Sequence, residues 1–140
     1  MVSMTDRVEL QKSERMLGEY QAQIARPTSS GWVGSIPMLN ASITNQRLIL
    51  VQQTRRPHPP ASIPFTYITK VSNITLSHRS AVQIKLRMGY VLHLFVGWGQ
   101  SEDFAGQLHS ILVPALRSRR YQPVLGTDDV HRLIEQISHL

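Results

Sequence analysis

The segment between Tyr20 and Ser101 carries many cationic side chains and no acidic one. All nine Asp and Glu residues of the chain lie outside it. Its eight cations are Arg26, Arg47, Arg55, Arg56, Lys70, Arg79, Lys85 and Arg87. Without a carboxylate, the segment cannot by itself perform general acid–base catalysis or hold Mg²⁺. A surface of one positive sign instead attracts anions, which means phospholipid, nucleic acid or an acidic protein.

The other reactive side chains form no catalytic or metal-binding pattern. The six histidines lack the spacing of a zinc motif, and the chain has no cysteine. There is no Gly-x-Ser-x-Gly turn and no glycine-rich phosphate loop. His93 lies in an apolar run, where we expect a neutral, hydrogen-bonded core side chain. We therefore expect a binding protein that is not an enzyme and uses no cofactor or metal.

Length and composition predict a single domain. The chain has 140 residues, is 41% hydrophobic, and has a formal net charge of +6. A chain of this size can bury about two-thirds of its unfolded surface. The polar N-terminus lacks the apolar stretch of a signal peptide, and no apolar run reaches the roughly 20 residues that span a bilayer. We expect a cytoplasmic protein without a transmembrane segment, whose membrane contact would be peripheral.

Hydrophobic periodicity predicts seven strands followed by a helix. The expected strands are 19–26, 39–44, 47–53, 61–64, 67–76, 82–88 and 90–96. Pro27 to Pro37, rich in Gly, Ser and Pro, indicates a long loop. From Ser101 the period changes to 3.6, which predicts a helix that Pro114 kinks or ends near Leu112. Since a long antiparallel sheet curls on itself, the expected fold class is α+β, a partly open barrel capped by that helix.

Both ends of the chain extend beyond this barrel. Residues 5–17 are weakly periodic and predict a short helix. Thr127 can cap a further helix, which carries an apolar stripe. The expected organisation is an N-terminal extension over 1–13, the barrel domain over 14–116, a linker over 117–126 and an amphipathic helix over 127–140.

Four segments carry motifs that fall in register with these elements. Residues 38–51, Met-Leu-Asn-Ala-Ser-Ile-Thr-Asn-Gln-Arg-Leu-Ile-Leu-Val, resemble the hairpin pattern L-x-L-T-N-x-R-L-I-F. Residues 62–71 resemble S-I-P-L-x-x-I-x-x-V, residues 89–96 resemble G-x-x-x-x-F-x-F, and 104–112 lie where a C-terminal helix would begin. Together the motifs resemble the GRAM and bacterial pleckstrin-homology-like domain family over about residues 14–113. The resemblance implies a seven-stranded roll capped by a helix, and a non-catalytic module that binds lipids, proteins or peptides.

The resemblance also implies a candidate site. In that family the loops after the first, third and sixth strands share one rim. The basic residues it would collect here are Arg26, Arg55, Arg56, His58 and Arg87, with Trp32 as an apolar anchor. Cations beside exposed apolar residues suit an anionic membrane, where each contributes about 1 kcal/mol. The alternative is that the loop charges are solvated and Trp32 packs against the barrel.

Two other cationic positions have structural interpretations. Arg47 follows the turn between the second and third expected strands, at the far end from the rim. There we expect it to hydrogen-bond to backbone carbonyls. Lys85 and Arg87 share the polar face of one strand, which indicates a solvated sheet face.

The C-terminal helix supports a second functional hypothesis. Leu133, Ile134 and Ile137 lie on its apolar stripe, which must be buried on its own domain, on a second copy or on a partner. The chain would then be a protein-interaction or self-association module. The cations are scattered, and no nucleic-acid-binding signature is present, which argues against nucleic acid. The leading hypothesis is an adaptor that binds an anionic lipid or an acidic protein partner.

Overall fold

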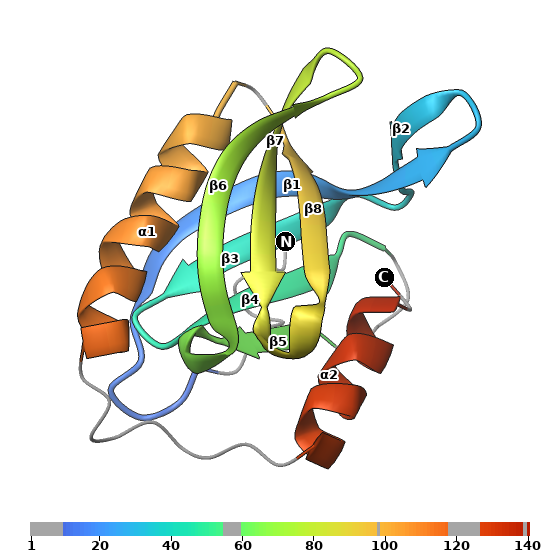
Figure 1. Ribbon diagram of the computed structural model, residues 1–140. Helices are drawn as coiled ribbons and strands as arrows, with labels where there is room; N and C mark the ends of the chain where they lie inside the picture. Colours follow the sequence, from blue (N-terminus) through green and yellow to red (C-terminus); the bar gives the residue numbers. More distant parts are fainter. Residues whose placement is uncertain (1–9, 55–59, 98, 118–126, 139) are drawn as a thin grey trace.

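The computed structural model describes residues 10–54, 60–97, 99–117, 127–138 and 140 (Figure 1). Its strands are β1 (Met16–Thr28), β2 (Gly31–Gly34), β3 (Leu39–Thr44), β4 (Arg47–Gln52), β5 (Ala61–Pro64), β6 (Ile68–Leu76), β7 (Arg79–Leu86) and β8 (Val91–Val96). Single 3₁₀ turns, η2 (Phe65–Tyr67) and η3 (Arg87–Gly89), precede β6 and β8. The helices are α1 (Ser101–Arg117) and α2 (Thr127–Ser138).

Strand β1 joins the two parts of an antiparallel sheet whose order is β5-β4-β3-β1-β8-β7-β6. Its first half pairs with β3, where Tyr20 is opposite Ala41. On its other side, Ile24 is opposite Leu94 of β8. Beyond this point β1 leaves the barrel and pairs with the short strand β2. In Figure 1, β6, β7 and β8 cross in front of β3 and β4, so that the sheet closes into two layers around the core.

The core follows from the period-2 pattern of the strands and the 3.6 pattern of the helices. Val82, Ile84 and Leu86 of β7 alternate with polar residues and are buried. Helix α1 covers one open side of the barrel with Phe104, Leu108 and Leu112. Helix α2 covers another side, next to β5, and contributes Leu133, Ile137 and the following Leu140 to the same core (Figure 1).

A glycine lets α1 approach β1 closely. Gly18 lies at an irregularity in the pairing of β1 with β3, and a Cβ atom there would collide with the side chain of Gln107. Gln107 Nε2 instead donates a hydrogen bond to the Leu17 carbonyl, at 2.9 Å. The Tyr20 hydroxyl donates to Gln107 Oε1, also at 2.9 Å, and the Tyr20 ring packs edge-on against Phe104.

The expected strand order and fold class are confirmed, with three local differences. The expected loop over 27–37 contains β2, because β1 continues through Thr28 and Gly31 turns the chain at a φ of 114°. Helix α1 continues past Pro114, since a proline near a helix end removes only one of many hydrogen bonds. Residues 10–15 are not helical, because Ser13 has a φ of 68°; residues 5–9 of that expected helix lie outside the described part of the chain.

Candidate functional site

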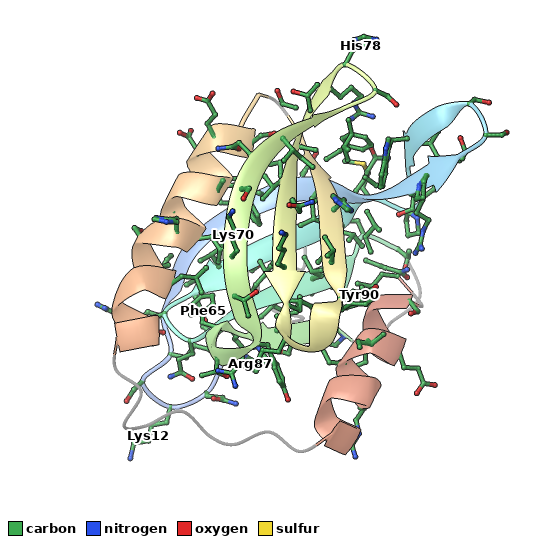
Figure 2. All side chains as sticks on the ribbon, viewed as in Figure 1. Lys12, Phe65, Lys70, His78, Arg87 and Tyr90 are labelled. Carbon is green, nitrogen blue, oxygen red and sulfur yellow. The ribbon has the colours of Figure 1, made fainter. Side chains whose placement is uncertain are left out.

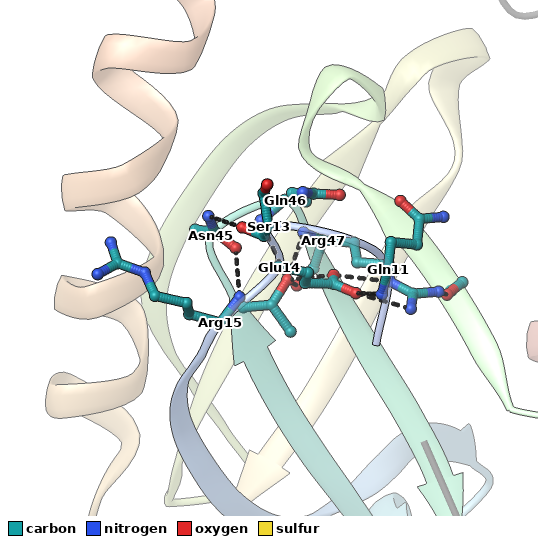
Figure 3. Close-up of polar contacts among 9 residues, drawn as sticks. Gln11, Ser13, Glu14, Arg15, Asn45, Gln46 and Arg47 are labelled. Atoms are coloured by element: carbon teal, nitrogen blue, oxygen red, sulfur yellow. Dashed lines mark hydrogen bonds and ion pairs between the residues drawn. The ribbon is translucent and has the colours of Figure 1, made fainter. Parts of the chain in front are cut away.

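Arg47, at the start of β4, is bound to a buried carboxylate (Figure 3). Its Nε donates to Glu14 Oε2 and its Nη2 donates to Glu14 Oε1, each at 2.9 Å. A third nitrogen, Nη1, donates to Ser62 Oγ at 2.6 Å. The Thr44 hydroxyl and the Gln11 backbone N–H also donate to the carboxylate, at 2.7 and 2.9 Å. Bidentate geometry with extra donors is the arrangement in which a buried ion pair is stable.

This carboxylate is held strongly in its charged form. The hydrogen bond from Arg47 is the main reason that the pKa of Glu14 falls to about 2, because it outweighs burial, which would raise the pKa. Asn45 fixes the same segment: its Oδ1 accepts from the Arg15 backbone N–H, and its Nδ2 donates to the Ser13 carbonyl (Figure 3). Arg47 therefore has a structural role, as expected, and the Glu14 carboxylate is a partner that the sequence did not predict.

Arg26 and Arg87, two of the residues expected to share one rim, are not brought together. Arg26 lies on the β1–β2 hairpin, opposite Val33. The hairpin is anchored at one end of β7, where the Trp32 backbone N–H donates to Ser77 Oγ at 2.8 Å. Arg87 follows the other end of β7, which is seven residue steps or roughly 23 Å away. Figure 2 shows Arg87 at the end of the barrel away from β2. The prediction of a shared rim was wrong for this pair, because β1 leaves the barrel after Ile24.

Three further expected site residues, Arg55, Arg56 and His58, lie outside the described residues. They follow β4 in the chain, within the loop that leads to β5. Their proximity to the hairpin or to Arg87 stays a prediction.

Trp32 packs on the outer face of the sheet. Its ring lies 4.9 Å from that of His93, and it contacts an outer cluster formed by Ala25, Ala81, Phe95, Ile74 and Leu76. Burial lowers the pKa of His93, so this ring is neutral at pH 7 and its Nε2 can accept a hydrogen bond from Gln83 Nε2, 3.2 Å away. Trp32 is thus held against the barrel and is not the free apolar anchor that the sequence suggested.

Two other apolar side chains of the hairpin region are exposed. Val33 is 46% exposed and Ile36 is 89% exposed. Because successive side chains of a strand point to opposite faces, Val33 and its partner Arg26 lie on the face of the hairpin opposite Trp32. Trp32, Val33 and Ile36 are the large apolar residues of the segment Pro27 to Pro37, and of the three only Trp32 was assigned to the candidate site from the sequence.

The apolar stripe of α2 is occupied within its own domain. Leu133 and Ile137 are 6% and 1% exposed, and Ile134 packs partly buried against the same core. Gln52 Nε2 of β4 donates to the Leu140 carbonyl at 3.1 Å and fastens the end of the helix segment. These three residues are therefore not a free interaction face, which corrects the alternative expectation for this helix.

Within the described part of the chain, no three His, Asp or Glu side chains lie close enough to hold a metal ion. Among the same residues, neither helix is long and apolar enough to cross a membrane. Two candidate surfaces remain among the described residues: the exposed β1–β2 hairpin, and the face of β6 and β7 on which the exposed Lys70 and Lys85 are opposite each other.

Comparison with known structures identifies the fold. The chain is similar to a Vps36 N-terminal PH domain, with a TM-score of 0.64 and 12% sequence identity over 79% of this chain and 87% of that one. It is also similar to the C-terminal domain of an unknown protein from Leishmania infantum, with a TM-score of 0.57 and 14% identity over 73% of this chain and 87% of that one. No protein-family model and no curated protein matches the sequence. At these identities the likeness shows the fold alone, and the expected pleckstrin-homology-like fold is confirmed.

Proposed function

We propose that this pleckstrin-homology-like chain is a non-catalytic binding module that attaches peripherally to anionic membranes through its β1–β2 hairpin. The observation that carries the proposal is the exposure of Ile36, at 89%, beside the half-exposed Val33. Val33 lies in β2 and Ile36 follows it, so both belong to one short segment, and exposed apolar side chains gathered in this way mark an interaction surface. The hairpin projects from the barrel in Figure 1, so that it can reach a flat surface before the rest of the domain.

The chemistry of the hairpin suits an anionic interface. Moving an exposed aliphatic side chain fully out of water contributes about 1.5–3 kcal/mol. Arg26, on the same face as Val33, is exposed and would contribute about 1 kcal/mol against anionic headgroups. No carboxylate between Tyr20 and Ser101 opposes this attraction. The sum predicts weak, reversible binding that decreases with salt.

The expected basic loop remains part of the proposal. Arg55, Arg56 and His58 would add to the attraction if their loop faces the same membrane. Arg87 and Trp32 are left out, since the first follows the far end of β7 and the second packs on the sheet. The GRAM-like motifs support a relation to the GRAM family, as a finer part of the same proposal.

Liposome co-sedimentation tests the proposal. We would compare neutral vesicles with vesicles containing phosphatidylserine, at about 50 and 200 mM salt. The wild-type chain should sediment with anionic vesicles at the lower salt concentration and much less at the higher one. Val33→Ser/Ile36→Ser should abolish sedimentation, and Arg26→Glu should weaken it.

Leu17→Ser is the matched control. Leu17 is an exposed apolar side chain, at 39%, on the part of β1 remote from the hairpin. Replacing this one exposed apolar side chain, away from the hairpin, should leave sedimentation unchanged. Absence of wild-type sedimentation with anionic vesicles, or an equal loss in Leu17→Ser and in the hairpin variant, would exclude the hairpin as a membrane anchor.

A further inference from the structure

A second cationic surface lies on the outer face of β6 and β7. Lys70 and Lys85 are opposite each other in the β6–β7 register, and both are exposed. Like charges placed directly opposite on neighbouring strands repel each other. The sequence provides no Asp or Glu between Tyr20 and Ser101 that could separate them. The pair is therefore a local positive charge that no neighbouring residue of the sheet neutralises.

A hollow of about 440 Å³ opens next to this pair. Lys85 forms one wall, and Leu86, Tyr90 and Val91 supply apolar surface. Arg87 adds a second positive charge at its border. No acidic side chain is among the described residues that line the hollow. Figure 2 shows Lys70 on β6 and both Arg87 and Tyr90 at the turn between β7 and β8.

The lining defines the chemistry of an occupant. The Thr69 hydroxyl already donates a hydrogen bond to the Lys85 carbonyl, at 3.1 Å, so that it holds the wall in place. The volume is at the lower end of ligand-sized sites and accommodates one or two side chains. An apolar floor beside two lysines favours an apolar group that is flanked by negative charges.

We infer that this surface binds an acidic peptide segment of a partner protein, with one apolar side chain in the hollow and carboxylates at Lys70 and Lys85. The hollow is open to solvent, and Val91, its most exposed apolar residue, is only 36% exposed. A surface without a strongly projecting apolar side chain has little to insert into a bilayer, whereas it can receive a side chain that projects from a partner. This site is independent of the β1–β2 hairpin, and the two together would make the domain an adaptor between a membrane and an acidic protein.

Titration with short peptides tests the inference on the full chain. The probe is a fluorescently labelled, end-capped peptide Glu-Glu-Leu-Glu-Glu, and the matched peptides are Gln-Gln-Leu-Gln-Gln and Glu-Glu-Ser-Glu-Glu. The acidic Leu peptide should bind, more weakly at about 200 than at 50 mM salt. The neutral peptide should not bind, and the Ser peptide should bind several-fold more weakly. Backbone amide shifts in an NMR titration should centre on Lys85, Tyr90 and Val91.

Charge reversal locates the site. Lys70→Glu/Lys85→Glu should abolish binding, and Lys70→Gln/Lys85→Gln should reduce it while preserving the fold. Lys12→Glu/Arg15→Glu is the matched control: it makes the same charge change at two exposed residues that do not line the hollow, and it should retain most of the affinity. Circular dichroism and thermal unfolding show whether each variant is folded.

Several results would overturn the inference. One is that the acidic Leu peptide does not bind, or binds equally to the Lys70→Glu/Lys85→Glu variant and to the wild-type chain. Another is that binding of phosphatidylserine vesicles or of an oligonucleotide requires these lysines, whereas binding of the peptide does not. That result would assign the surface to a lipid or a nucleic acid. Self-association that is lost in the same variant would assign it to a second copy. Loss of vesicle binding in the hairpin variant alone would leave this inference intact, so the two proposals fail separately.

Discussion

Two cationic positions in the same sheet are built in opposite ways. At the start of β4, Arg47 meets a fully buried carboxylate, and each of its three side-chain nitrogens donates a hydrogen bond. On the outer face of β6 and β7, Lys70 meets Lys85, a second positive charge. The charge at the first position is neutralised within the chain, whereas at the second the residue opposite in the strand register is another cation.

A segment without acidic residues is therefore not uniformly accessible to anions. The carboxylate that closes the first position comes from Glu14, outside the acid-free segment, because residues 10–15 turn back onto the β3–β4 hairpin. In the described strand register, Lys70 is opposite Lys85, and Lys85 is also opposite Val91 of β8, so neither lysine is opposite a carboxylate. Folding therefore divides cations that look alike in the sequence into structural ones and exposed ones.

Removing the ion pair between Arg47 and Glu14 should have the largest effect on stability. Arg47→Met leaves the Glu14 carboxylate buried and without its main partner, which should lower the free energy of unfolding by about 3–5 kcal/mol. Chemical denaturation at neutral pH measures this. Arg15→Met, at an exposed neighbour, should change it by less than about 0.5 kcal/mol. Equal stability of the two variants would contradict the structural role of Arg47.

Acid should weaken the ion pair between Arg47 and Glu14, because it protonates the Glu14 carboxylate. The pKa of Glu14 is about 2 in the folded chain, below the ordinary value of 4.5. The pair's contribution is thus complete above about pH 4.5 and is lost as the pH falls from there toward 2, by about 2–3 kcal/mol. Denaturation curves at about pH 7 and pH 3 should show this loss in the wild-type chain. Glu14→Gln should be less stable at neutral pH and show a smaller loss on acidification; an unchanged loss would assign the acid sensitivity to other groups.

Removing the Trp32 ring from the outer face of the sheet should have an intermediate effect on stability. Trp32→Ala removes a half-buried ring from His93 and should destabilise the chain by about 2 kcal/mol. The pKa of His93, lowered by burial, should then rise toward 6.5, which an NMR pH titration of the ring protons detects. In the wild-type chain, the contribution of His93 to the free energy of unfolding is complete above pH 6.5. It decreases as the pH falls below 6.5, because the unfolded chain then binds a proton more readily. Val33→Ala is the control, and a His93 pKa that stays lowered in Trp32→Ala would contradict burial by the indole as the cause.

Removing the repulsion between Lys70 and Lys85 should have the smallest effect on stability, and it should stabilise the chain. Lys70→Gln removes one of two like charges that face each other, so it should raise the free energy of unfolding by about 0.2–1 kcal/mol. The gain should shrink at high salt, because salt screens exposed charges. Lys12→Gln, which has no facing cation in the sheet register, should give no gain. A loss of stability in Lys70→Gln would mean that this lysine has a structural partner after all.

The regular parts of the fold were predictable because burial imposes a period. Val82, Ile84 and Leu86 revealed β7, and the apolar face of 101–112 revealed α1. Features set by contacts between distant residues were not predictable in this way. Strand β2 forms because β1 continues beyond the residues that pair with β8. The Glu14 carboxylate, which binds Arg47, lies 33 positions earlier in the chain.

The candidate site was predicted less well, for a similar reason. Exposure of Ile36 and the opposition of Lys70 and Lys85 are properties of packing and register. A sequence shows which residues are apolar or charged, but the register decides which of them face each other. Trp32 was recognised by its type, and its burial follows from contacts with His93 and Ser77 that lie far along the chain.

The central place of β1 also sets an order of events when the chain is made. Residues 22–24 are paired with 94–96, so this edge of β1 cannot be covered until β8 has been synthesised. Closure over so long a loop is entropically costly and slow. Until then a growing chain carries an open strand edge, which is a template for pairing with other chains. A nascent or truncated chain that lacks β8 would for this reason be the form of the protein most dependent on chaperones.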